Sequence, residues 1–309
     1  MHTLELDGLV PAAVTPMTDA FEIDEAALRD YIRWLLSFDG LKAAAVNMDT
    51  GEGPHLTAEE RKKIISVWKE ETGPRLLVLA GVGGPSTAEA VRQAREAEQA
   101  GADALVIFPI PAYLGKPLAP EIPLKHHQAI AAATGLPLVL FQLQPDLGGV
   151  IFDEETLGRL LEIESVVAIK EASFDTVIFA RTEEAVRRTS RKISVLTGND
   201  NFILESFLLG ADGALIGFGT VAVAEQIQMI RLAKDGRYPE ALDIYRSKIR
   251  PLVNAVFAPP VRDYRARLKE ALALMGVVPK AIMRPPLLPL GGADKLKLGR
   301  TLRELGIIE

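Results

Sequence analysis

The sequence contains no cysteine among its 309 residues. Disulfides, thiolate nucleophiles, iron–sulfur clusters and cysteine-ligated zinc sites are therefore excluded. Basic side chains are in the minority, with 35 Lys and Arg against 41 Asp and Glu and a net charge of −6. Because counterion release from nucleic acid requires a basic surface, we expect no nucleic-acid partner.

The chain also lacks a long apolar run. Its longest stretch without a charged residue, 126–145, is interrupted by Gln, Thr, Gly and Pro residues, so no membrane helix and no membrane partner are expected. The amino terminus, MHTLELDGLV, has neither the basic start nor the apolar core of a signal peptide, which predicts a cytoplasmic protein. With 48% hydrophobic residues, the chain is long enough to bury a full-sized core.

Short apolar runs alternate with longer segments of helical periodicity through the first two thirds of the chain. We expect eight strands, at 8–15, 43–48, 76–82, 104–109, 137–143, 166–172, 193–198 and 213–218. Runs such as LLVLAGV and PLVLF are apolar throughout, which is typical of parallel strands covered by helices. Eight such units predict an α/β fold of the (β/α)8 TIM barrel class. An open doubly wound sheet is the alternative.

Local signals mark where helices begin and where the pattern changes. Thr57 with Glu60 has the spacing of a capping box, and Ser86 and Asp153 precede helical segments. After residue 220 the pattern is helical only, and the pairs Pro259–Pro260 and Pro285–Pro286 interrupt it. We therefore predict a barrel domain of residues 1–220 and a helical carboxy-terminal domain of residues 221–309.

Lys170 is the leading candidate for a reactive residue. It directly follows the apolar run Val166–Ile169 at the end of the sixth predicted strand, where barrel enzymes place their reactive groups. Burial lowers the pKa of an amine, and a neutral amine can attack a carbonyl to form a Schiff base. The alternative is a structural lysine that pairs with Glu171 or another carboxylate.

Other strand ends also carry polar residues. The turn Asp49–Gly53 offers a hydroxyl, a carboxylate and backbone amides that suit a carboxylate or phosphate, although such residues also form ordinary loops. Thr15 and the segment Thr197–Asp200 lie at two further strand ends. The neighbours His126 and His127 face different ways on a helix, so no metal site is predicted. A serine-hydrolase elbow, GxSxG, is absent.

Taken in order, the segments DTGEG with LTAEER, AGVGGPSTAEA, GADALVIFP, VVAIKEAS, GADGALIG and RPPLLPL resemble the dihydrodipicolinate synthase and N-acetylneuraminate lyase family across residues 7–308. The resemblance implies a (β/α)8 barrel, usually tetrameric, whose lysine forms a Schiff base with pyruvate or another 2-oxo acid. Lys170 matches that lysine. Thr50 and Gly51 match the turn that grips the 2-oxo acid carboxylate. Leu215 matches a position whose backbone carbonyl lies near the substrate.

Several positions depart from the family pattern. Phe141 replaces a tyrosine that shuttles a proton, which phenylalanine cannot do. Asp49 falls on the same relay, so we hypothesise that Asp49 or a bound water serves as acid and base. Tyr113 is the candidate counterpart of a second family tyrosine. Asp146 or a close neighbour stands where dihydrodipicolinate synthases have an arginine for their aldehyde substrate, and an acid there would repel that substrate.

The sequence thus predicts a lyase of the class I aldolase type that binds a 2-oxo acid, with an aldehyde as second substrate, and is not a true dihydrodipicolinate synthase. The chemistry requires no metal and no organic cofactor. A dehydratase or deaminase of a 2-keto-3-deoxy sugar acid, acting through the same imine, is one alternative. A catalytically inactive 2-oxo acid binding protein is another. Family analogy favours a homotetramer or homodimer.

Overall fold

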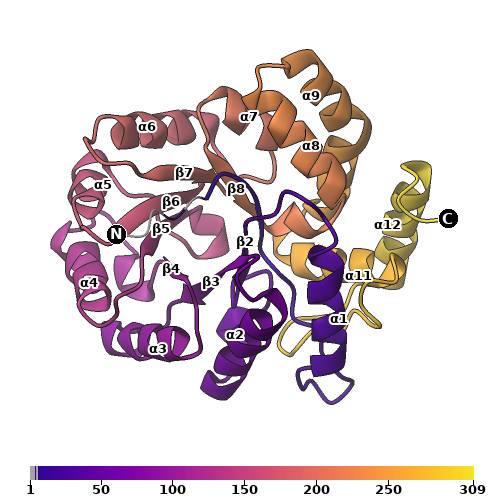
Figure 1. The fold of residues 1–309 in the computed structure, drawn as a ribbon, viewed down its shortest axis with the longest axis horizontal. Coiled ribbons are helices and arrows are strands. Elements are labelled where there is room, and N and C mark those ends of the chain that lie inside the picture. The colour runs from indigo at the N-terminus through magenta and orange to yellow at the C-terminus, as the bar shows by residue number, and fades with distance from the viewer. Residues whose placement is uncertain (1–3, 5) are drawn as a thin grey trace.

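In the computed structural model, which describes residue 4 and residues 6–309, eight parallel strands form a barrel inside a ring of helices (Figure 1). The strands are β1 Gly8–Pro11, β2 Ala43–Val46, β3 Leu77–Val82, β4 Ala104–Ile107, β5 Leu138–Leu143, β6 Val166–Ala172, β7 Ser194–Thr197 and β8 Gly213–Ile216. Hydrogen bonds join them in the order β1-β8-β7-β6-β5-β4-β3-β2. The ring closes where Ala12 bridges Ala45 and the Ala13 amide donates to the Ala45 carbonyl over 2.8 Å. The predicted barrel is confirmed, and the open sheet is wrong.

The barrel helices are α1 Glu25–Leu35, α2 Ala58–Thr72, α3 Thr87–Gln99, α4 Glu121–Ala131, α5 Glu154–Leu161, α6 Thr176–Arg187, α7 Ile203–Leu208 and α8 Val223–Lys234. The predicted capping box is present: the Glu60 amide donates to the Thr57 hydroxyl, and the Thr57 amide donates to the Glu60 carboxylate. Ser86 and Asp153 cap α3 and α5 as expected. No helix in the described part of the chain is both long and apolar enough to cross a membrane.

Strand alternation divides the apolar side chains into two cores. One core fills the barrel interior with side chains that include Val10, Ala45, Leu79, Val106, Val139, Ala168 and Leu196. The other lies between the barrel and its helices and continues into the carboxy-terminal helices. A polar side chain on the inward face of a strand is therefore surrounded by hydrocarbon until it reaches the mouth of the barrel.

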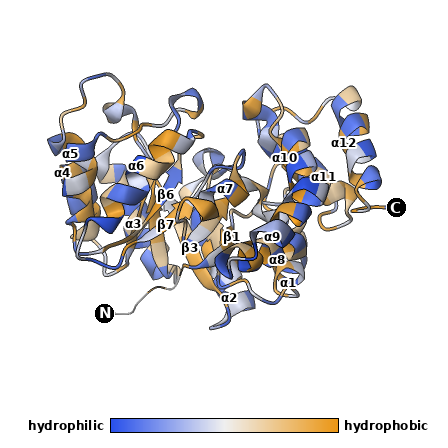
Figure 2. Cartoon of the chain, turned by 90° about the horizontal axis from the view of Figure 1, so that it is seen from above, coloured by the Kyte–Doolittle hydropathy of each residue, from blue (hydrophilic) through white to orange (hydrophobic). Residues whose placement is uncertain are grey.

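The carboxy-terminal helices are α9 Tyr238–Ile244, α10 Arg250–Val256, α11 Tyr264–Leu274 and α12 Gly292–Glu304. The turned view shows α10, α11 and α12 together on one side of the molecule, opposite α4 and α5 (Figure 2). Pro259 and Pro260 lie between α10 and α11, as expected. Because α8 packs against β1 and α7, it takes the place of the eighth barrel helix. The boundary after residue 220 stays a prediction.

A buried ion pair ties the carboxy-terminal helices to the loop after β2. Lys269 on α11 contacts Glu52, and their side chains are only 1% and 0% exposed. The Lys269 amine also donates to the Ile282 carbonyl over 2.7 Å, and the Arg284 amide donates to Glu52 over 2.8 Å. Glu52 adopts a left-handed backbone conformation with φ of 61°. The turn before α2 is therefore held by residues more than 200 positions away in the sequence.

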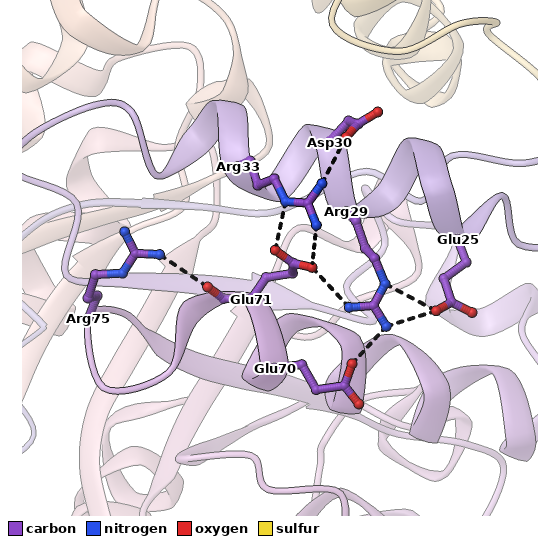
Figure 3. A network of polar contacts seen from close by, with 7 residues as sticks. All are labelled: Glu25, Arg29, Asp30, Arg33, Glu70, Glu71 and Arg75. Carbon is purple, nitrogen blue, oxygen red and sulfur yellow. Dashed lines mark hydrogen bonds and ion pairs between the residues drawn. The ribbon is translucent and has the colours of Figure 1, made fainter.

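A second ion network lies on the surface between α1 and α2 (Figure 3). Arg29 contacts Glu25 on its own helix and both Glu70 and Glu71 on α2, and Arg33 also contacts Glu71. Ion pairs at the surface contribute little to stability, because water already solvates the separated charges. The network links neighbouring helices of the ring but stabilises the fold much less than the apolar cores.

We expect Lys269→Met to lower the free energy of unfolding by about 3–5 kcal/mol, because it leaves the Glu52 carboxylate buried without its cation. The double variant Glu52→Gln, Lys269→Met removes both charges and should recover part of that loss. Urea unfolding followed by circular dichroism measures both effects. Equal stability of Lys269→Met and the unmodified protein would contradict this account of the ion pair.

Candidate active site

A cavity opens at the carboxyl ends of the strands, in the mouth of the barrel. It encloses about 410 Å³ of space, part of it open to solvent. Its walls are Met48, Asp49, Thr50, Phe141, Leu143, Leu147, Lys170, Ala172, Phe174, Gly198, Asp200, Gly217, Phe257 and Tyr264. A concave site of this size, with mainly apolar walls and a few convergent polar groups, suits a small organic ligand.

Lys170 projects into this cavity from β6. Strand alternation places it on the inward face with Ala168 and Ala172, and the sheet register pairs it with Phe141 on β5. The Lys170 amine lies 4.2 Å from the centre of the Phe141 ring, and the residue is 8% exposed. Burial lowers the pKa of Lys170 to about 8, although the charges of Asp200 and Asp49 act in the opposite direction. A substantial fraction of the amine is thus neutral at mildly alkaline pH.

Glu171 faces the opposite side of β6. Its carboxylate accepts hydrogen bonds from the side-chain amide of Asn199 over 2.6 Å and from the Ser173 amide over 3.0 Å. The side-chain amide of Gln142 lies 3.4 Å away. Since these partners lie behind the strand, Glu171 does not pair with Lys170. The sequence alternative of a structural lysine beside another carboxylate stays untested.

Asp200 is an acidic residue of the same cavity that sequence reasoning did not single out from the segment Thr197–Asp200. It follows β7, is 4% exposed, and its Oδ1 accepts the Phe218 amide over 2.8 Å. Burial raises the pKa of Asp200 to about 7, with hydrogen bonds from backbone amides and the charge of Lys170 opposing the shift. One cavity therefore holds an amine of lowered pKa and a carboxyl group of raised pKa. Such a pair can exchange a proton near neutral pH.

The turn after β2 presents Thr50 to the cavity, as predicted. Gly51 instead shapes the turn: its amide donates to the Met48 carbonyl over 3.1 Å, and its carbonyl accepts the Thr15 hydroxyl over 2.8 Å. A Cβ atom at Gly51 would lie only 2.6 Å from the Ala13 carbonyl oxygen, so the close approach of the two backbones requires glycine here.

Two residues of α11 complete the site, and local sequence patterns gave no sign of either. The Tyr264 hydroxyl donates to Asp49 over 3.0 Å and lies 3.4 Å from the Thr50 hydroxyl. Arg265 forms an ion pair with Asp49, and its Nε also donates to the Asp49 carbonyl over 3.1 Å. The Tyr264 ring stacks on Phe257 with their centres 4.9 Å apart. The carboxy-terminal helices thus form one wall of the cavity.

Other predicted residues lie outside this cavity. Tyr113 is buried against His126 and Phe152, with ring centres 5.8 and 6.2 Å away. Leu215 points into the barrel interior, two residues before the cavity residue Gly217. A substrate role for Tyr113 or for the Leu215 carbonyl stays a prediction. Among residues 4 and 6–309, no three His, Asp or Glu side chains gather as metal ligands would.

The fold and the cavity define a (β/α)8 barrel with a lysine-centred site at the carboxyl ends of its strands. The chain belongs to the Dihydrodipicolinate synthetase family, whose profile matches residues 5–305. This confirms the family predicted from the sequence.

Individual relatives match over almost the whole chain. The 4-hydroxy-tetrahydrodipicolinate synthase of Chlorobium limicola is 32% identical over 100% of both chains. The structure of dihydrodipicolinate synthase from Thermotoga maritima superposes with a TM-score of 0.89 at 28% identity, covering 99% of this chain and 100% of that one. The dihydrodipicolinate synthase of Acinetobacter baumannii, solved in complex with pyruvate, superposes with a TM-score of 0.86 at 30% identity, covering 98% and 100%.

The pKa of Lys170 can be tested through its reaction with formaldehyde and a borane reductant, which methylates neutral amines. We expect the methylation rate of Lys170, read by peptide mass spectrometry, to rise with pH and to have its midpoint near pH 8. In Asp200→Asn the midpoint should move to lower pH, because the lost carboxylate charge favoured the ammonium form. A midpoint near the ordinary lysine value of about 10.4 would contradict this prediction.

Proposed function

We propose that the chain is a lyase that binds pyruvate or a similar small 2-oxo acid as a Schiff base on Lys170. The observation that carries this proposal is the buried Lys170 amine of lowered pKa, facing a cavity that also presents the Thr50 hydroxyl. The pyruvate complex of the Acinetobacter baumannii relative supports it. No metal or organic cofactor enters this chemistry.

Schiff-base formation begins with the neutral amine. Asp200 accepts a proton from the Lys170 ammonium group, and the free amine then attacks the C2 carbonyl of the 2-oxo acid. The carbonyl oxygen takes up two protons and leaves as water, while the lysine nitrogen becomes bonded to C2. The turn that carries Thr50 holds the carboxylate of the 2-oxo acid, with Gly51 allowing the turn to fold closely against the strand ends.

The imine then makes the neighbouring carbon acidic, and a group in the cavity must accept a proton from C3. Phe141 cannot do so, although its ring lies beside the amine. The Tyr264 hydroxyl can accept this proton, because it donates its own hydrogen bond to the Asp49 carboxylate. The Thr50 hydroxyl can in turn donate a hydrogen bond to Tyr264. We therefore infer that the proton passes from C3 to the Tyr264 hydroxyl, whose own proton passes to the Asp49 carboxylate. The resulting enamine is the nucleophile of an aldol reaction.

A dehydratase or deaminase remains the second candidate function. Asp200 favours it, because a carboxyl group whose pKa burial raises to about 7 can protonate a departing hydroxyl or amino group. In that reaction the enamine electrons expel the leaving group from the substrate, and the same Lys170 imine is hydrolysed at the end. The two functions share every step up to the enamine.

The Schiff base can be trapped. The protein is incubated with pyruvate, and separately with 2-oxobutyrate and 2-oxoglutarate, and then reduced with borohydride. The peptide that carries Lys170 should gain the mass of the 2-oxo acid plus two hydrogens, less one water. The variant Lys170→Met should show no adduct. Absence of an adduct with all three acids in the folded protein would overturn the proposed lyase and favour a protein that only binds 2-oxo acids.

The proton route can be tested without knowledge of the second substrate. In heavy water, the enzyme should exchange the C3 hydrogens of pyruvate for deuterium, which proton NMR follows directly. Asp49→Asn and Tyr264→Phe should each slow this exchange by about 100-fold or more while the borohydride adduct still forms. Tyr245→Phe is a matched control, since Tyr245 is equally buried but lies outside the cavity. Unchanged exchange in Asp49→Asn would exclude Asp49 as the proton acceptor.

A further inference from the structure

The rim of the cavity is apolar, and the proposed Schiff-base chemistry does not use it. Leu143, Leu147, Phe174 and Phe257 all line the cavity and are half-buried, whereas Lys170 and the other polar groups lie mostly deeper. These four side chains come from the end of β5, the loop after it, the loop after β6 and the segment after α10. Apolar surface that converges on a cavity but is left partly in water is typical of a site for an apolar ligand.

The backbone fixes these side chains at the rim. Phe174 has a φ of 61°, a left-handed conformation that is strained for a bulky residue. The Asn199 side chain stabilises this conformation by accepting the Phe174 amide over 2.6 Å. A Cβ atom at Gly149 would lie 2.3 Å from Leu143, so the loop that carries Leu147 folds tightly against the strand end. Strain held in place at a cavity points to a function for the ring it presents.

Phe257 is fixed from the other side. Its ring stacks on Tyr264 with an interplanar angle of 13°, and Tyr264 is itself hydrogen-bonded to Asp49. The Tyr264 hydroxyl therefore lies at Asp49, while the Phe257 ring stacked on Tyr264 adds apolar surface to the same cavity. In a 2-oxo acid bound as an imine on Lys170, the reacting carbon would lie near the Tyr264 hydroxyl. The molecule that reacts with it would lie against the hydrocarbon of the rim.

The charges of the site also favour an apolar ligand. Lys170 is the one cation among the residues that line the cavity, and the proposed imine occupies it. Asp49 and Asp200 are acidic, and Asp146 is exposed beside Leu147. Arg265, which contacts the turn at Asp49, is already paired with that carboxylate. A second carboxylate would therefore meet no free cation, and a chain of hydroxyl groups would meet hydrocarbon at the rim.

We propose that the second substrate is an apolar aldehyde, whose hydrocarbon part packs against Leu143, Leu147, Phe174 and Phe257. This inference rests on the proposed Schiff-base function. The enamine C3 attacks the aldehyde carbon to form a carbon–carbon bond, and the aldehyde oxygen receives the electron pair and a proton. Water then hydrolyses the imine, which releases a 4-hydroxy-2-oxo acid and restores the Lys170 amine. The reverse reaction cleaves the same bond.

The test compares three aldehydes of different polarity, each with pyruvate: benzaldehyde, glyceraldehyde and aspartate semialdehyde. Product formation is followed by liquid chromatography and mass spectrometry of the 4-hydroxy-2-oxo acid. We expect kcat/KM for benzaldehyde to exceed that for either polar aldehyde by at least about tenfold. A preference for glyceraldehyde or aspartate semialdehyde would overturn the inference, and so would the absence of product with benzaldehyde.

A rim variant separates this inference from the proposed function. Phe174→Asn removes the ring but keeps a residue that tolerates left-handed backbone. It should lower kcat/KM for benzaldehyde by about tenfold or more, with the Lys170 adduct and the C3 exchange of pyruvate unchanged. Leu288→Asn is the matched control, because Leu288 is 78% exposed and lies outside the cavity. If Phe174→Asn and Leu288→Asn change kcat/KM for benzaldehyde equally, the rim assignment is overturned. If the unmodified protein forms no pyruvate adduct, the proposed lyase function itself is overturned.

Discussion

The desolvation of one amine governs the chemistry of this molecule. Lys170 lies on the inward face of β6 between Ala168 and Ala172, and the Phe141 ring covers it from the neighbouring strand. Hydrocarbon on these sides disfavours the ammonium form, while Asp200 limits how far the pKa falls. The amine is therefore reactive without being permanently neutral. Every role assigned to the cavity depends on this balance between burial and the nearby carboxyl groups of Asp200 and Asp49.

The carboxy-terminal helices are part of the site rather than an addition to the barrel. Through Tyr264, Arg265 and Lys269, α11 contacts three positions of a single turn: Asp49, Thr50 and Glu52. That turn follows β2 and presents the Thr50 hydroxyl to the cavity. Because its contacts come from α11, the geometry of the site requires the barrel and the carboxy-terminal helices to fold together. The cavity thus contains the Tyr264 hydroxyl, which α11 supplies.

Much of this architecture could be predicted from the sequence, because the signals are local. Apolar runs of strand length, the capping pattern of Thr57 with Glu60 and the strand-end position of Lys170 each involve a few neighbouring residues. Tyr264 could not be found in this way, since its hydrogen bond to Asp49 joins residues 215 positions apart. Asp200 was visible as a strand-end residue, but only the folded structure shows that it is buried in the same cavity as Lys170. Glu171 looked like a partner for Lys170 until strand alternation placed it on the other face.

The most direct measurement is a crystal structure of the protein soaked with pyruvate. The account predicts continuous electron density between the Lys170 Nζ and C2 of the bound acid, with the carboxylate at the Thr50 turn and the rim of the cavity still open. Pyruvate bound without a covalent link to Lys170, or bound at another place in the barrel while Lys170 contacts Asp200, would contradict it.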